Sequence, residues 1–298
     1  MGDSASSLRM ALVDRAWIQW IAIGVDAVGQ SDDAVVDPEA LIAVTAELGD
    51  ADARLRDLST DWCVSYGRYV NGSRLKQVVR ELRTPPDSIG QYVATITAAG
   101  GPTWPMATRP RSDYIARGKA RLETATTMPR LRIRLSAAFG VNARADVLAA
   151  MLAAPRTGRS VADLARVTRF TKPNVASAIE ALVLAGLLHA EAVGNERRVT
   201  LTMKGAILPG LRPPVYQPDW VTRFRVVLEA LRFMERNAMP PSVRAIEARR
   251  VVDSVIASIN SEDLPEPNLH AFGEAFGPAF DRWVVDLVYW LRLPNRRK

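Results

Sequence analysis

The sequence predicts a mainly α-helical fold whose central segment, near residues 139–206, combines three helices with a β-hairpin. Apolar residues recur at spacings of three and four through most of the chain, which is typical of amphipathic helices. Several Ser, Thr, Asp and Asn residues stand where helix N-caps are expected. Only residues 187–202 alternate around a glycine turn in the manner of paired strands. A chain of 298 residues can bury more than one core.

Residues 1–100 are expected to form an N-terminal helical domain. Apolar spacing predicts helices at 10–28, 38–48, 51–66 and 73–82. Asp37 followed by Pro38 is typical of an N-cap with proline in the first turn. Residues 84–86 and 100–105 are rich in proline and glycine, so we predict irregular structure and a hinge between them.

Residues 101–138 are expected to form a basic connector that contains proline and glycine. A short helix is predicted at 113–125, with Arg117, Lys119 and Arg121 on it, before an alternation of arginines at 130, 132 and 134. These side chains are consistent with a solvated connector and equally with contacts to phosphate groups.

The central segment, residues 139–206, begins with a helix that Asn142 can cap and that ends by residue 155. Ser160 and Asp163 have the spacing of a capping box, which places the start of a second helix at Val161. After a short turn, Thr171 can cap a third helix that carries proline in its first turn and runs to residue 185.

A β-hairpin is predicted after the third helix. Gly186 is expected to end the third helix, and residues 187–193 then form a strand that leads to a turn at 194–196. Residues 197–202 return as the second strand. The last part of the chain, 207–298, is predicted to be a C-terminal helical region, with an extended stretch at 209–218 and helices at 219–236, 242–259 and 268–293.

The central segment resembles the winged helix-turn-helix of the ArsR and MarR groups of bacterial regulators, on residues 160–165, 173–175 and 181–188. The resemblance covers roughly a fifth of the chain, so it implies nothing about the flanking helices, dimerisation or ligand sensing. It implies a sequence-specific protein that binds double-stranded DNA, most simply a bacterial transcriptional regulator. Metal sensing of the ArsR type is not expected, because the matching helices lack a Cys or His pair.

In such a module the third helix, near 172–185, enters the major groove, and the wing at 189–203 contacts the backbone or the minor groove. The core side of this helix is expected to be Val175, Ile179, Leu182 and Val183. Asn174 can pair with adenine, and Lys172 can reach guanine or a phosphate. The candidate DNA contacts are Arg169 in the turn, Thr171, Lys172, Asn174, Ser177 and Ala178 on the helix, and Asn195, Arg197 and Arg198 in the wing.

The charge distribution favours the same region. The formal net charge is +7, and residues 1–100 carry 9 basic and 14 acidic side chains, whereas residues 101–140 carry 8 and 2. Positive charge is therefore concentrated in the central part of the sequence, as expected of a protein that binds a polyanion there. A single cysteine, Cys63, and the lack of a signal segment at the start of the sequence suit a bacterial cytoplasm, with no membrane partner.

No pattern indicates an enzyme. The two histidines, His189 and His270, are far apart, and the Ser73 to Lys76 spacing lacks the companion motifs of the enzymes that use it. Glycine-rich nucleotide-binding patterns are also missing from the sequence. We therefore expect no catalytic residue, no metal and no cofactor.

Two other functions remain open. A winged helix can bind proteins, so the chain is also consistent with an antitoxin-like or defence-associated factor whose acidic N-terminal region contacts a partner protein. An architectural or plasmid-replication protein that binds DNA for another purpose is the second alternative. A homodimer through the flanking helices is compatible with each of them.

Overall fold

The computed structural model describes residues 2–111, 114–122, 127–154, 157–194, 196–207, 210, 215–236, 238–262 and 264–293. This part of the chain contains thirteen α-helices and one three-stranded antiparallel sheet, which confirms a mainly α fold. None of the helices in these ranges is long and apolar enough to span a membrane.

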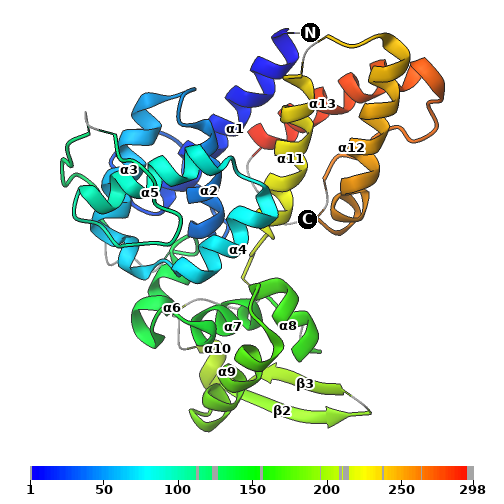
Figure 1. Cartoon of the computed structure of the whole chain (residues 1–298). Helices are drawn as coiled ribbons and strands as arrows, with labels where there is room; N and C mark the ends of the chain where they lie inside the picture. Colours follow the sequence, from blue (N-terminus) through cyan, green and yellow to red (C-terminus); the bar gives the residue numbers. More distant parts are fainter. Residues whose placement is uncertain are drawn as a thin grey trace.

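Helices from the two ends of the sequence pack into one large helical body (Figure 1). The first helix packs along the last one and also against the helix at 220–234. The largest fully buried side chains of this body include Trp20, Trp62, Trp220 and Trp283, so these tryptophans serve to pack its core. Its helices are α1 (Gly2–Ala22), α2 (Pro38–Leu48), α3 (Ala53–Tyr66), α4 (Gly72–Leu82), α5 (Pro86–Ala98), α11 (Trp220–Met234), α12 (Pro241–Glu262) and α13 (Phe276–Arg292).

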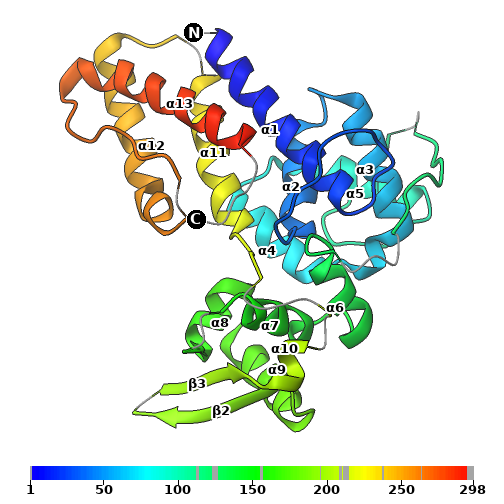
Figure 2. The same cartoon turned by 180° about the vertical axis from the view of Figure 1, so that it is seen from behind.

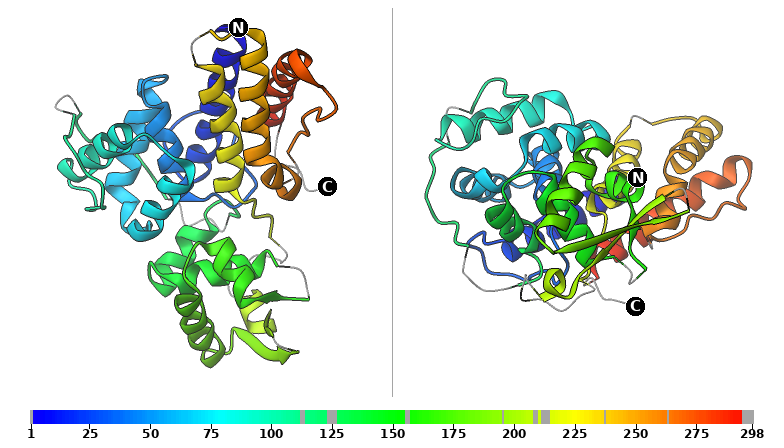
Figure 3. Two further views of the ribbon diagram at one scale, coloured as in Figure 1. Left: turned by 45° about the vertical axis from the view of Figure 1, so that its right-hand side comes forward. Right: turned by 90° about the horizontal axis from the view of Figure 1, so that it is seen from below.

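A smaller body lies below the large one and has its own hydrophobic cluster (Figure 2). Its strands are ordered β1-β3-β2, with Leu188 opposite Leu201 and Val193 opposite Glu196. The β2–β3 hairpin lies at the end of the molecule away from the large body (Figures 1 and 3). The elements are α6 (Leu131–Phe139), α7 (Ala143–Leu152), β1 (Arg159–Ser160), α8 (Val161–Thr168), α9 (Lys172–Leu184), β2 (Leu188–Val193), β3 (Glu196–Leu201) and α10 (Met203–Ile207). The division of the chain into four domains stays a prediction.

Two expectations for the N-terminal half are wrong. The first helix spans Gly2–Ala22 rather than 10–28, and α5 occupies the stretch where irregular structure was expected. Pro86 is in the first turn of α5, where a missing amide hydrogen costs nothing, and Ile89, Val93 and Ile96 form its buried side. The proline therefore starts this helix instead of breaking it.

The helix expected at 113–125 is also wrong. Residues 114–122 form no helix, and the ends of the predicted element, Asp113 and Ala125, lie outside the described residues. The buried carboxylate of Asp61 accepts hydrogen bonds from the backbone N–H groups of Arg117, Gly118 and Lys119 at 2.6, 2.9 and 2.6 Å. These amide groups are bound by Asp61 of α3 around a left-handed turn at Gly118 (φ 62°), so the segment is held against the surface of that helix.

Candidate nucleic-acid interface

Helix α7, the first of the three helices expected in the central segment, lies at the centre of the smaller body. Asn142 caps it as predicted, because its side-chain oxygen accepts a hydrogen bond from the Arg144 N–H at 2.9 Å. Val147, Leu148 and Leu152 are fully buried, and α7 packs against α6, α8 and α9. Helices α8 and α9 therefore both pack on α7.

Helix α8 begins at the capping box that the sequence predicts. The Ser160 hydroxyl accepts a hydrogen bond from the Asp163 N–H at 3.1 Å and donates to the Asp163 carboxylate at 3.0 Å. These contacts with Ser160 are the main reason that the pKa of Asp163 is lowered. The helix ends at Thr168, and the next residue, Arg169, has the left-handed conformation with φ 61°.

Helix α9 begins at Thr171, whose hydroxyl accepts from the Asn174 N–H at 3.5 Å. Its buried side consists of Val175, Ala178, Ile179 and Leu182. Ala178 is only 4% exposed, so its assignment to the outer, DNA-facing side is wrong. The spacings of three and four residues from 175 to 178 and on to 182 place it on the core side of the helix.

The outer face of α9 keeps the other predicted residues and adds two more. Thr171, Lys172, Asn174 and Ser177 are all exposed. Glu180 and Leu184 continue the same face, since they follow Ser177 at spacings of three and seven residues, and Leu184 is 91% exposed. The face therefore presents hydrogen-bonding groups in its first two turns, a carboxylate in the third and an apolar side chain at its end.

The wing stands beside this face. Arg197 on β3 lies 3.8 Å from the Glu180 carboxylate, an ion pair that links the hairpin to α9. Arg198, the next residue on the strand, donates instead to the Thr157 carbonyl oxygen at 3.2 Å. Asn195, the third predicted wing residue, lies outside the described residues.

The order of helices and strands from α7 to β3 is that of a winged helix. Residues 142–198 match the MarR family. The match spans α7, α8, α9 and the first part of β3, and leaves the large helical body outside. No curated protein and no solved structure matches the chain. The chain thus contains a MarR-type winged helix, the fold of a family of DNA-binding regulators.

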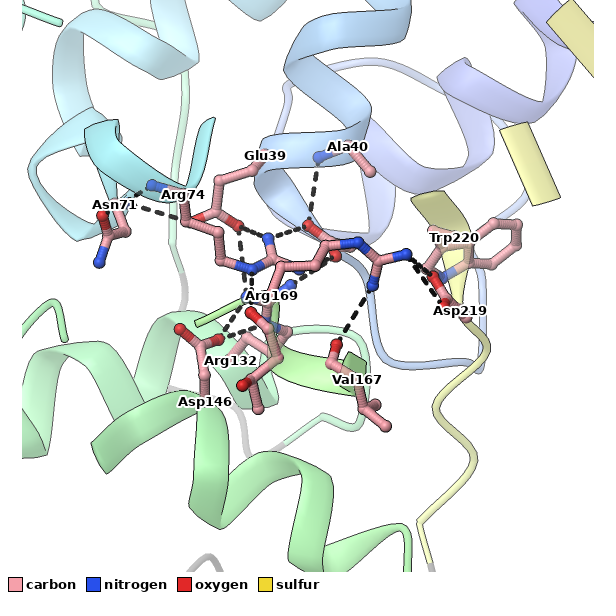
Figure 4. A network of polar contacts seen from close by, with 12 residues as sticks. Glu39, Ala40, Asn71, Arg74, Arg132, Asp146, Val167, Arg169, Asp219 and Trp220 are labelled. Carbon is pink, nitrogen blue, oxygen red and sulfur yellow. Dashed lines mark hydrogen bonds and ion pairs between the residues drawn. The ribbon is translucent and has the colours of Figure 1, made fainter. Parts of the chain in front are cut away.

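Arg169, predicted to contact DNA, is held inside the protein. Its side chain is 7% exposed and lies 2.9 Å from the Glu81 carboxylate of α4 and 2.8 Å from that of Asp219, the N-cap of α11. The left-handed turn between α8 and α9 directs this arginine towards the large body (Figure 4). Its assignment as a DNA contact is therefore wrong, and it fastens the MarR-type winged helix to the flanking helices.

A buried ionic network continues this junction (Figure 4). Arg74 of α4 lies 2.6 Å from Asp37 and 2.7 Å from Glu39, both from the start of α2. It also donates to the carbonyl oxygen of Thr168, the last residue of α8, at 3.1 Å. The network therefore bonds the large body directly to the end of the second winged-helix helix.

Arg132 of α6 enters the same network from the smaller body. It lies 2.7 Å from Asp37 and forms an ion pair with Asp146 of α7. Burial tends to raise the pKa of Asp37, but Arg132 and Arg74 outweigh it and hold that pKa well below its usual range. The alternation at 130–134 thus contains a buried structural arginine, a role that neither sequence interpretation assigned.

Possible metal ligands are not gathered within the described ranges. No three His, Cys, Asp or Glu side chains in them are placed to hold a metal ion. Cys63 is fully buried in the large body, and this burial raises the pKa of its thiol. His189 is exposed on β2, 3.9 Å from Glu191.

Proposed function

We propose that the protein binds double-stranded DNA in a sequence-specific manner and acts as a bacterial transcriptional regulator. The observation that carries the proposal is the exposed outer face of α9, with Lys172, Asn174 and Ser177 on it and the wing arginine Arg197 beside it. A helix of this width fits the major groove, and these are the side-chain types that bind base edges and phosphates there.

The residues of the face have distinct roles in this proposal. Asn174 forms paired hydrogen bonds with an adenine, and Lys172 reaches a guanine or a phosphate. Thr171 and Ser177 donate to phosphates or to neighbouring bases. Leu184, which the sequence interpretation did not include, provides an apolar contact for a thymine methyl group or for the sugar backbone.

Glu180 acts with Arg197. This carboxylate alone would repel phosphates, but the pairing with Arg197 at 3.8 Å partly neutralises it. A carboxylate in the groove accepts a hydrogen bond from the cytosine amino group, so Glu180 favours a cytosine and disfavours close phosphates. The pair therefore contributes to specificity more than to affinity.

The test is selection of bound duplexes from a random-sequence pool by the full-length protein, followed by binding measurements across a salt series. A recurrent motif with a steep salt dependence supports the proposal. Steep salt dependence without any motif supports an architectural DNA-binding role instead. An absence of binding at low salt favours the winged helix as a protein-interaction module, and overturns the proposal.

A further inference from the structure

The large body contains a cavity that the proposed DNA interface does not use. It has a volume of about 630 Å³ and is lined by residues of α4 and α5 and by Met106 and Thr108. Val79, Ile89 and Met106 form its apolar floor. This volume and this floor are in the range of pockets that bind small molecules.

The rim of the cavity is basic. Lys76 and Arg80 follow one another along one face of α4, and Arg83 is its C-cap. No carboxylate is among the residues that line the cavity. Arg83 lies 3.3 Å from Glu229, outside the cavity, and Arg80 donates to Gln77. Lys76 has no ion-pair partner among the described residues. The cavity therefore combines an apolar interior with a positive field at its mouth.

A buried hydroxyl in the wall has no partner. Thr84 is 4% exposed and lines the cavity, and its Oγ1 forms no hydrogen bond within the described residues. Buried hydroxyl groups are nearly always hydrogen-bonded, because an unpaired one loses its bonds to water without replacement. The accessible area of this Oγ1 is below 1 Å², so a small shift of the wall would let a ligand oxygen supply the missing partner.

The walls are held in unusual backbone conformations. Only three described non-glycine residues have positive φ, and two of them line this cavity: Arg83 at 53° and Met106 at 92°. Such conformations cost free energy and gather at ligand sites. The Thr108 N–H donates to the Gly90 carbonyl oxygen at 3.0 Å, and a Cβ on Gly90 would lie 2.5 Å from the Thr108 side chain. The segment is thus fixed against α5, which keeps the cavity open.

We propose that this cavity binds an amphipathic anion, a small molecule with an apolar body and a carboxylate or similar acidic group. The apolar body lies over Val79, Ile89 and Met106, and the acidic group lies between Lys76 and Arg80. Arg74 and Glu81, on the opposite face of α4, hold the winged helix, so the ligand site is separated from that junction by the width of one helix. The proposal does not require that the protein binds DNA.

The experiment uses the full-length protein with ¹³C-labelled methionine methyl groups and octanoate as the probe. The Met106 signal, assigned from a Met106→Leu variant, is expected to shift and saturate, while the signals of the exposed Met10 and Met203 stay in place. Octylammonium, which has the opposite charge, is expected to cause no saturable shift.

Charge-reversal variants at the rim and on another exposed segment distinguish an effect of the rim charges on octanoate binding from an effect of the net charge of the protein. Lys76→Glu with Arg80→Glu is expected to weaken octanoate binding by about tenfold or more, because two charge-assisted contacts are lost. Arg117→Glu with Lys119→Glu makes the same charge change on an exposed segment outside the cavity, and is expected to leave binding unchanged. Thr84→Val keeps the shape of the wall, and is expected to weaken octanoate binding without loss of stability.

The proposal is overturned if Met106 does not respond to octanoate, or if octylammonium binds equally well. It is also overturned if the rim variant and its control bind octanoate with equal affinity. Binding of an acidic peptide without binding of octanoate would likewise contradict a small-molecule site and indicate a protein partner instead.

Discussion

Neighbouring residues on α9 have opposite environments. Ser177 is exposed on the outer face, whereas Ala178 is buried between α9 and the core of the smaller body. One step along a helix turns the side chain by about 100°, which is enough to separate a solvent position from a core position. The same substitution at the two positions therefore tests which face of α9 is free for DNA.

Ala178→Glu is expected to lower the free energy of unfolding by about 2 kcal/mol or more, because it buries an unpaired carboxylate. Ser177→Glu, the matched control, is expected to change the stability by less than about 0.5 kcal/mol and yet to weaken DNA binding through repulsion of phosphates. Chemical denaturation measures the first effect and a binding titration the second. Equal stability of both variants would contradict this orientation of α9.

The wing is the second element of the interface. Arg197 is exposed beside α9, and Arg198 is half-buried and bound to the Thr157 carbonyl oxygen. The effect of a phosphate-contacting cation appears in the salt dependence of binding, because each contact releases counterions from DNA.

Arg197→Ala with Arg198→Ala is expected to reduce the slope of log affinity against log salt by about two. The measurement is a set of binding titrations between low and moderate salt. An exposed arginine of the large body, changed in Arg250→Ala, is expected to leave the slope unchanged. A double wing variant with the wild-type slope would exclude the wing from the interface.

The turn between α8 and α9 is fastened to the large body by Arg169. Arg169→Ala is expected to lower the free energy of unfolding by about 3 kcal/mol, because Glu81 and Asp219 lose a buried partner. Arg166→Ala removes an exposed arginine that lies 3.6 Å from Asp163, and is expected to cost less than about 1 kcal/mol. Thermal and chemical unfolding of both variants measure the difference. Equal losses of unfolding free energy in the two variants would mean that the contacts of Arg169 do not stabilise the fold.

Local signals account for the parts of these elements that the sequence predicted. The N-caps at Asn142, Ser160 and Thr171 depend on side chains that bond amide groups two or three residues away, so spacing alone reveals them. The hairpin likewise follows from alternation around a glycine. Ala178 was misplaced because a small apolar side chain gives a weak signal for either face of a helix.

Contacts between distant segments account for what the sequence did not predict. Arg169 and Arg132 look like any other exposed arginines until the fold brings Glu81, Asp219 and Asp146 to them. The course of residues 114–122 is likewise set by one distant carboxylate, that of Asp61. Neither the apolar periodicity of the sequence nor its local charge pattern indicates these distant partners.

At the scale of the whole molecule, the winged helix and the large body meet in a buried ionic network, beside apolar contacts in which Ile133 of α6 joins the core of the large body and Val35 that of the smaller one. Two arginines, Arg74 and Arg132, share the carboxylates of Asp37 and Glu39. Such a network is stable only when every member keeps its partners, since removal of one leaves a buried charge. The junction therefore fixes the position of the winged helix and depends on the ionisation of Asp37.

The low pKa of Asp37 makes the stability of this junction depend on pH. A carboxylate whose pKa is lower in the folded than in the unfolded chain adds stability above the unfolded pKa, near 4, and this stability is lost as the pH falls towards the folded pKa. Asp37→Asn is therefore expected to be less stable than the wild type at pH 7, by a margin that shrinks below about pH 4.

Denaturation curves of the wild type and Asp37→Asn at a series of pH values measure this margin. Asp50→Asn changes a fully exposed carboxylate, and is expected to leave the wild-type profile unchanged. A margin for Asp37→Asn that stays constant from neutral to acid pH would show that the ionisation of Asp37 does not support the junction.

Recognition of base sequence by α9 is tested most sharply by the effect of Asn174→Ala on binding to a selected cognate duplex and to an unrelated duplex of the same length. A loss of about 1–3 kcal/mol is expected on the cognate duplex and almost none on the other, because Asn174 binds a base. Asn260→Ala, on the exposed side of α12, is the control and is expected to bind both duplexes as the wild type does. An equal loss on both duplexes, or no loss on either, would contradict recognition of base sequence by α9.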